Sequence, residues 1–158
     1  MAKDEQQLKE YRVQARHYHK ILLAIDVDDF TSSQPAFDYG CSLALQEQAE
    51  VGITTVVESH DISVFDSLSP AKMDDKRLEA AHILLEYVKK AQAFGLEGVH
   101  PLLAEGVPEK AILEEVIPAF KPDLVVVGSE AKKINGKTIG LQAERIAEKA
   151  PISVLVVR

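Results

Sequence analysis

Six residues decide the fold of this chain: Ile21-Leu22-Leu23-Ala24-Ile25-Asp26. The run is apolar on both faces of an extended chain and ends in an acid, which is typical of a central strand in a parallel sheet. A second run of the same kind, Leu124-Val125-Val126-Val127, is closed by Gly128. We therefore expect two fully buried strands, one near each end of the chain.

Three further apolar runs predict strands at 53–57, 99–104 and 152–157. Pro101 lacks a backbone N–H, so its strand is expected at an edge of the sheet. Helical patterns separate the five runs, and this alternation indicates parallel strands with helices on both faces. With the most apolar strands in the centre, we expect a doubly wound α/β fold with strand order 3-2-1-4-5.

Four helices are predicted between these strands. Thr31-Ser32-Ser33 offers N-cap oxygens for the first helix, and Pro35 fits its first turn. Ser69-Pro70 opens a long second helix that Gly95 ends, Pro108 starts the third, and the fourth covers 141–150. Apolar periodicity predicts the inward faces of the first three helices: Phe37, Cys41, Ala44, Leu45 and Ala49; Leu78, Ala81, Leu85, Val88 and Ala91; Ile112, Leu113, Val116, Ile117 and Phe120.

Length and composition predict one globular domain, with a polar tail at 1–17 and the domain at 18–158. The chain has 158 residues, is 46% hydrophobic and carries a formal net charge of −7. This charge repels nucleic acid, and the only cluster of basic residues is the small group Lys132, Lys133 and Lys137, so nucleic acid is not an expected partner.

No membrane segment and no disulfide are expected. No apolar run approaches the ~20 residues of a membrane helix, and the tail lacks the apolar region of a secretory signal, so we expect a cytoplasmic protein. The single cysteine, Cys41, is interpreted as a small core residue. His17 and His19 lie on the polar tail and are expected to be solvated.

The expected ligand site lies where the winding of the sheet reverses, beyond the carboxyl ends of the first and fourth strands. Asp26 and Gly128 should face each other across this crevice. The loop 128–140 then leads into a helix, and a glycine-bearing loop with lysines before a helix N-terminus favours an anion such as phosphate. A purely structural role, with turn-forming glycines and solvated lysines, is the alternative.

Over about residues 18–158, the chain resembles the universal stress protein family. Four segments carry the resemblance: Tyr18-His19-Lys20-Ile21-Leu22-Leu23-Ala24-Ile25-Asp26, Gly106-Val107-Pro108-Glu109-Lys110-Ala111-Ile112, Pro122-Asp123-Leu124-Val125-Val126-Val127-Gly128-Ser129, and Glu144-Arg145-Ile146 with Ala150-Pro151-Ile152-Ser153-Val154-Leu155-Val156-Val157-Arg158. The resemblance implies the 3-2-1-4-5 sheet and a homodimer formed by pairing of the last strands, 152–157.

The family divides into members that bind ATP and members that do not. In ATP-binding members an acid that ends the first strand, here Asp26, contacts the nucleoside. By resemblance, ATP or another adenine nucleotide, with Mg²⁺ possible, would be held by Ile25, Asp26, Val27, Val57, Val127, Gly128, Ser129, Ala131, Lys132, Gly140, Leu141 and Gln142.

The loop departs from the ATP-binding pattern Gly-x2-Gly-x9-Gly-Ser/Thr. Gly128 matches the first glycine, but Ala131 replaces the second, and Gly140 follows after eight residues instead of nine. Leu141 replaces the Ser or Thr whose hydroxyl would meet phosphate. Two functions therefore remain open: a nucleotide-binding stress protein, or a dimeric member that has lost the nucleotide and acts through protein contacts.

Two other patterns occur at the same crevice. Ala131–Thr138 fits a permissive phosphate-loop pattern, with Lys137 on phosphates and Thr138 on magnesium, which would make the protein an NTPase. Asp28 and Asp29, with Asp26, are weak candidates for a divalent cation, although such acids commonly cap the next helix. No arrangement of nucleophile and base is visible, so we expect no enzymatic activity beyond slow ATP hydrolysis.

Overall fold

Five parallel strands form the single sheet of the computed structural model, which describes residues 3–58, 70–129 and 141–158, with only the backbone for 70–73 and 141. The strands are β1 (Lys20–Ala24), β2 (Glu50–Val57), β3 (Val99–Glu105), β4 (Leu124–Gly128) and β5 (Ser153–Val157). Their order is β3-β2-β1-β4-β5, and every neighbouring pair is parallel. The predicted sheet order is confirmed, and so is the edge position of the strand that contains Pro101.

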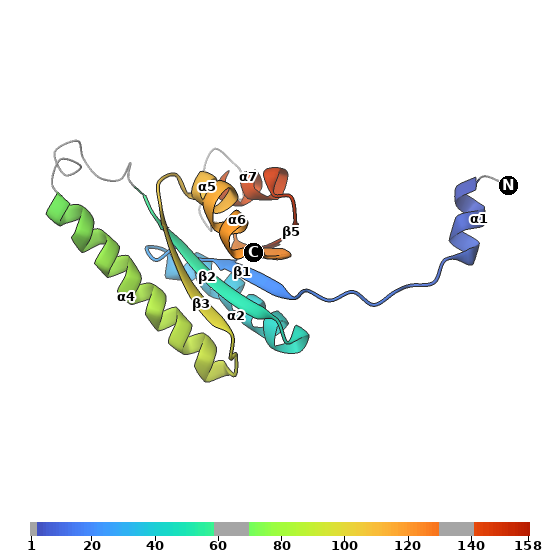
Figure 1. Ribbon diagram of the computed structural model, residues 1–158, viewed down its shortest axis with the longest axis horizontal. Helices are drawn as coiled ribbons and strands as arrows, with labels where there is room; N and C mark the ends of the chain where they lie inside the picture. The colour runs from blue at the N-terminus through green and yellow to red at the C-terminus, as the bar shows by residue number, and fades with distance from the viewer. Residues whose placement is uncertain (1–2, 59–69, 130–140) are drawn as a thin grey trace.

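Helices cover both faces of the sheet (Figure 1). On one face lie α2 (Phe30–Glu47) and α4 (Pro70–Phe94). On the other face lie α5 (Pro108–Ala111), a π-helical segment η2 (Ile112–Val116), α6 (Ile117–Phe120) and α7 (Leu141–Lys149). No helix within the described ranges is long and apolar enough to cross a membrane.

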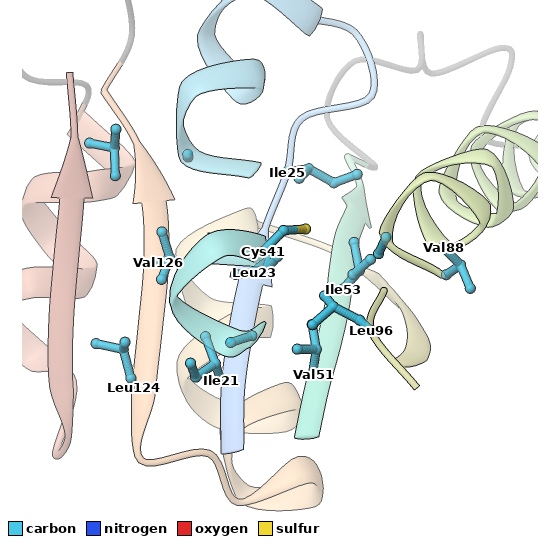
Figure 2. Close-up of a cluster of buried hydrophobic side chains, with 14 of the residues drawn as sticks. Ile21, Leu23, Ile25, Cys41, Val51, Ile53, Val88, Leu96, Leu124 and Val126 are labelled. Carbon is cyan, nitrogen blue, oxygen red and sulfur yellow. The ribbon is translucent and has the colours of Figure 1, made fainter. Parts of the chain in front are cut away.

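The central strand β1 divides its side chains between two hydrophobic clusters, one on each face. Ile21 and Leu23, with Ile25 just beyond the strand, point toward α2 and α4 (Figure 2), whereas Leu22 and Ala24 belong to the cluster beneath η2, α6 and α7. Ile21 and Leu22 are 0% exposed and Leu23 is 1% exposed. Burial of each such side chain contributes about 1.5–3 kcal/mol, so both layers of helices depend on this strand.

The start of α2 differs from the prediction. Asp29 is the N-cap, because its carboxylate accepts a hydrogen bond from the backbone N–H of Ser32 at 3.1 Å. The predicted cap, Thr31-Ser32-Ser33, is therefore wrong: these residues are already helical. Pro35 lies inside the helix, beyond its first turn, and not at its start.

The predicted inward face of α4 is only partly correct. Val88 and Ala91 are buried as predicted, but Leu78 and Leu85 are 60% and 47% exposed. The buried stripe instead runs through Ala80, Leu84, Val88 and Ala91. Two apolar stripes overlap on this helix, and periodicity alone cannot tell which one meets the sheet. Leu45 of α2 is likewise 44% exposed.

Other boundaries shift for identifiable reasons. The predicted helix from Pro108 contains the π-helical turn, in which the Ile117 N–H bonds to the Ile112 carbonyl. Pro118 follows this turn and has no N–H to continue the α-helical register. Strand β2 begins earlier than predicted, and β5 begins at Ser153. Gly95 has a φ of +125°, which confirms its role in ending α4.

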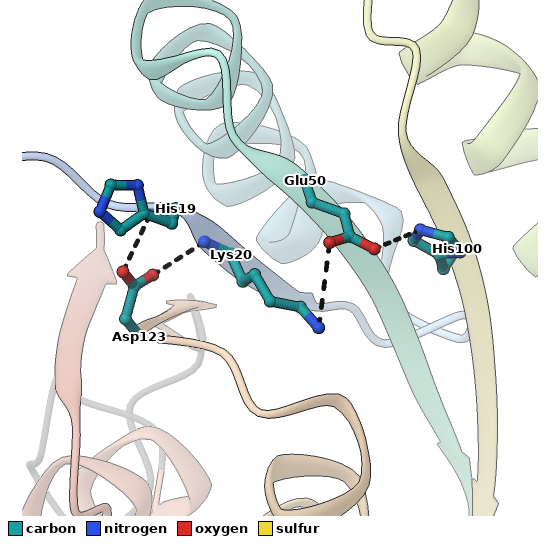
Figure 3. Close-up of polar contacts among 5 residues, drawn as sticks. All are labelled: His19, Lys20, Glu50, His100 and Asp123. Carbon is teal, nitrogen blue, oxygen red and sulfur yellow. Dashed lines mark hydrogen bonds and ion pairs between the residues drawn. The ribbon is translucent and has the colours of Figure 1, made fainter.

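Asp123 ties the start of β1 to the start of β4 (Figure 3). Its two carboxylate oxygens accept hydrogen bonds from the backbone N–H groups of His19 at 2.8 Å and Lys20 at 2.9 Å. The Asp123 N–H donates in return to the Lys20 carbonyl at 2.9 Å. Beside this contact, Glu50 of β2 lies 3.9 Å from Lys20 and 2.7 Å from His100 of β3. One polar cluster thus joins the starts of four strands.

We predict that Asp123→Ala lowers the free energy of unfolding by about 1–3 kcal/mol, because two strand N–H groups lose a charged acceptor. Asp123→Asn should fall between the alanine variant and the natural protein, since its amide oxygen retains one acceptor. Urea denaturation monitored by circular dichroism measures the difference. An unchanged midpoint for the alanine variant would show that water replaces the carboxylate without cost.

Candidate functional site

A pocket opens at the carboxyl ends of β1, β2 and β4, where the winding of the sheet reverses. Its walls come from these strand ends, the first turn of α2, the start of α5 and the first turns of α7. The cavity has a volume of about 80 Å³, smaller than the ~300–1,000 Å³ of typical small-molecule pockets. A nucleotide would therefore have to displace side chains or lie partly outside it.

A tight turn after β1 brings Asp26 to the pocket. The buried Ser33 hydroxyl accepts a hydrogen bond from the Asp26 N–H at 2.9 Å and donates to the Asp26 carbonyl at 3.2 Å. One Asp26 carboxylate oxygen accepts from the Asp28 N–H at 2.9 Å. The backbone on both sides of Asp26 is thus held in place while its side chain remains exposed.

The N-terminus of α2 forms the adjoining wall. Both carboxylate oxygens of Asp29 serve the helix cap, one on the Ser32 N–H and the other on the Ser32 hydroxyl at 2.7 Å. Tyr87 of α4 is close enough to Asp26 and Asp29 to be affected by their negative charges. Burial raises the pKa of the Tyr87 hydroxyl, and these two charges raise that pKa further. Tyr87 therefore stays neutral at physiological pH.

Gly128 lies directly against the backbone of α2. A Cβ atom at this position would meet the Ser32 carbonyl oxygen at 2.5 Å and the Ala36 Cβ at 3.6 Å. A backbone oxygen cannot move aside as the end of a flexible side chain can. Gly128 is therefore required for the close approach of α2 to the end of β4, whether or not a ligand binds.

The opposite wall is held by two polar contacts of α7, one with α5 and one with the residue that follows β2. Arg145 of α7 donates to the Glu109 carboxylate of α5 at 2.5 Å. Partial burial would raise the pKa of Glu109, but the hydrogen bond from its own N–H and the Arg145 guanidinium lower it overall. Gln142 of α7 donates to Glu58, just after β2, at 3.3 Å. These contacts fix α7 against the pocket.

The described walls of the pocket are acidic. They include Asp26, Asp28, Asp29 and Glu58, and none of their residues is a lysine or arginine. Within the described part of the chain, no group of three or more His, Cys, Asp or Glu side chains is arranged to hold a metal ion. Since Asp29 caps α2, the structure offers no support for a cation held by Asp26, Asp28 and Asp29.

The pocket brings together some of the residues that the sequence singled out. Ile25, Asp26, Val127, Gly128 and Gln142 line it. Three others do not line it: Val27 packs against the core cluster beneath α2, Val57 is 4% exposed, and the Ser129 N–H bonds to the Val157 carbonyl at 2.8 Å. Ala131, Lys132 and Gly140, the spacing of the loop, and the phosphate-loop pattern with Lys137 and Thr138 lie outside the described residues, as does the Leu141 side chain.

Sequence reasoning assigned only Val57 of β2 to the site and missed the residues of this strand that line the pocket. Thr54 and Thr55, 0% and 2% exposed, line the pocket together with Val56 and Glu58. The Thr54 hydroxyl donates to the Leu102 carbonyl at 2.8 Å. Two adjacent threonines in an otherwise apolar central strand were the available signal, because buried hydroxyls need partners and can serve a ligand.

We predict that Gly128→Ala destabilises the protein by about 1–3 kcal/mol through overpacking against the Ser32 backbone. Gly98→Ala is the matched control, because the nearest atom to its added Cβ is Glu50 Cγ at 3.5 Å, an ordinary contact. The control should lie within about 1 kcal/mol of the natural protein. Thermal unfolding compares the two. Equal melting temperatures would show that α2 shifts without cost.

Comparison with known proteins agrees with this architecture. A model of the universal stress protein family matches residues 17–158. Curated universal stress proteins of Staphylococcus aureus strains USA300 and NCTC 8325 are each 25% identical over 142 residues, which cover 89% of this chain and 84% of theirs.

Solved structures show the same fold. The universal stress protein UspA from Lactobacillus plantarum superposes with a TM-score of 0.75 at 22% identity, covering 91% of this chain and 100% of its own. A universal stress protein in complex with cAMP gives a TM-score of 0.68 at 24% identity, with coverage of 90% and 98%. One from Archaeoglobus fulgidus in complex with dAMP gives 0.63 at 16%, with coverage of 90% and 100%. With the family model matched across the whole sheet, this chain belongs to the universal stress protein family.

Proposed function

We propose that this universal stress protein binds an adenine nucleotide in the pocket between the ends of β1 and β4. The observation that carries the proposal is the coincidence of Asp26, Val127 and Gly128 in one pocket at the reversal of the sheet, which is where doubly wound folds bind nucleotides. Complexes of similarly folded proteins with cAMP and dAMP support the same ligand class.

Each part of the pocket suits a part of such a ligand. The Asp26 carboxylate is exposed and can accept hydrogen bonds from a ribose or a base. Ile25, Ile112 and Val127 supply apolar surface for the base. In this proposal the nucleoside end of the ligand lies among these residues and the phosphates extend toward the start of α7.

The negative charge of the pocket walls determines in which form the phosphates of a nucleotide could bind. The four carboxylates of the described walls would repel a triphosphate, so we expect ATP to bind as its Mg²⁺ complex and more weakly without the ion. The lysines of the loop, Lys132, Lys133 and Lys137, would add positive charge beside the phosphates. Nucleosides should show no such dependence on Mg²⁺.

The competing function is a family member that no longer binds nucleotides and acts through protein contacts. The small cavity favours it, at about 80 Å³, and so does a Gly128 that close packing against α2 already explains. Calorimetric titration of the protein with adenine nucleotides separates the two functions.

We predict that Asp26→Asn weakens binding of adenosine and Mg²⁺-ATP by about 10- to 100-fold, since one lost charged hydrogen bond corresponds to about 1.5–3 kcal/mol. Asp38→Asn is the matched control, because it removes the same charge from the exposed surface of α2, outside the pocket. Isothermal titration calorimetry with adenosine, cAMP and ATP, each with and without Mg²⁺, measures the affinities. Absence of binding up to millimolar concentrations for every ligand would overturn nucleotide binding, and equal losses in both variants would remove Asp26 from the site.

We further propose that two copies pair through β5. This strand is at an edge of the sheet and is bonded only to β4 among the described strands. Its Leu155 is 38% exposed. An apolar strand at an open edge is covered in most proteins, because its free N–H and C=O groups otherwise invite aggregation.

We predict that Leu155→Lys weakens this association, because a charge on the edge strand opposes pairing with a second copy. Leu103→Lys is the control on the opposite edge, where Leu103 of β3 is 42% exposed. Analytical ultracentrifugation over a range of concentrations should show a higher dissociation constant for the β5 variant alone. Equal constants for both variants and the natural protein would exclude β5 as the interface.

A further inference from the structure

The chain carries an N-terminal arm, residues 3–17, that stands away from the rest of the molecule (Figure 1). It consists of the helix α1 (Lys3–Glu10) and an extended segment that leads to β1. No residue of α1 is buried. Leu8, Tyr11 and Val13 are 70%, 58% and 87% exposed, so the arm presents apolar side chains to solvent.

A helix of this kind needs a partner surface. Isolated helices shorter than about 12–15 residues are marginal in water, and α1 has eight residues. Leu8 and Tyr11 are three residues apart and share one side of the chain, where the Tyr11 N–H bonds to the Leu8 carbonyl at 3.2 Å. The family match begins at residue 17, so the arm lies almost entirely outside it.

A groove suited to this arm lies at the other end of the sheet from the nucleotide pocket. It has a volume of about 490 Å³ and runs between the end of α2 and the turn that follows α4. Leu45 is its exposed apolar residue, with Ala44 and Leu96 buried beneath at 0% and 6% exposed, and Glu50 and Glu97 give it negative charge, with no lysine or arginine in its lining. Leu45 is 44% exposed.

We propose that the arm of one copy docks in the α2–α4 groove of a second copy of this chain. Leu8 and Tyr11 would cover Leu45 of the groove. The segment 11–17 carries Arg12 and Arg16 and no acid, which complements Glu97 and Glu50 of the groove; Glu50 also contacts Lys20 and His100.

The point at which the arm joins the domain allows two copies to exchange arms, each placing its arm in the groove of the other. His17 bonds through Nδ1 to Glu47 Oε2 at 2.7 Å, next to Gln48 of the groove. Each arm therefore leaves its own domain beside its own groove. The seven residues of the segment 11–17 span at most ~23–25 Å, so a two-fold axis near this point lets each arm reach the groove of the other copy.

Disulfide trapping tests the proposal on the full chain. Val13→Cys protein is mixed with Leu45→Cys protein, and separately with Leu78→Cys protein, under mild oxidation. Leu78 is the matched control: it is an exposed leucine on α4, 17 residues before Gly95, hence about 25 Å from the groove along the helix. The natural Cys41 is 4% exposed and does not compete.

We expect the disulfide-linked pair of Val13→Cys with Leu45→Cys to form at least tenfold faster than the pair with Leu78→Cys. Adding Leu8→Asp and Tyr11→Asp to the arm should abolish this preference, whereas the same pair of changes should leave nucleotide affinity unchanged. Equal rates with both partners would overturn the proposal. A double variant, Val13→Cys with Leu45→Cys, that closes within one chain at low concentration would also overturn it, because the arm would then occupy its own groove.

Discussion

The pairing of β1 with β4 is the constraint on which the rest of the structure depends. It joins segments about a hundred residues apart in sequence, with Ile21 opposite Leu124 and Ala24 opposite Val127. Because both strands are apolar on both faces, neither is stable without a layer of helices on each side. Their shared direction also brings Asp26 and Gly128 to one crevice. The Asp123 contact at the opposite end keeps the two strands in register.

Much of this architecture could be predicted, because it rests on patterns that are local in sequence. Continuous apolar runs predicted the central strands, and Pro101 predicted the edge. The errors occurred where two local solutions compete. On α4, Leu78 and Leu85 form one apolar stripe, and Ala80 and Leu84 form another. Which of the two stripes faces the sheet is decided by the packing of the helix against the sheet, which the sequence does not show. At α2, Asp29 caps the helix ahead of three residues that could also have served.

The site was predictable in position but only partly in composition. Its position follows from strand order, so Asp26 and Gly128 could be assigned to it. The pair Thr54-Thr55 is a local signal, but its meeting with Glu58 and Gln142 in one pocket follows from the tertiary fold and leaves no periodic pattern in the sequence. Conversely, Val27 and Val57 neighbour the right residues in sequence but do not line the pocket: Val27 lies in the turn after Asp26 and packs against the core, and Val57 is 4% exposed.

Gly128 illustrates why a matched motif residue is weak support for a ligand. In the family pattern a glycine at this position accompanies phosphate, yet here the Ser32 carbonyl would lie 2.5 Å from any Cβ. The fold alone therefore requires the glycine, and it would persist in a relative that had lost the nucleotide. Asp26 is different. Its backbone is held by Ser33, and that restraint would survive replacement of its carboxylate by an amide. Loss of binding in that variant would therefore report on the ligand, whereas loss of binding in a Gly128 variant would report first on the packing of α2.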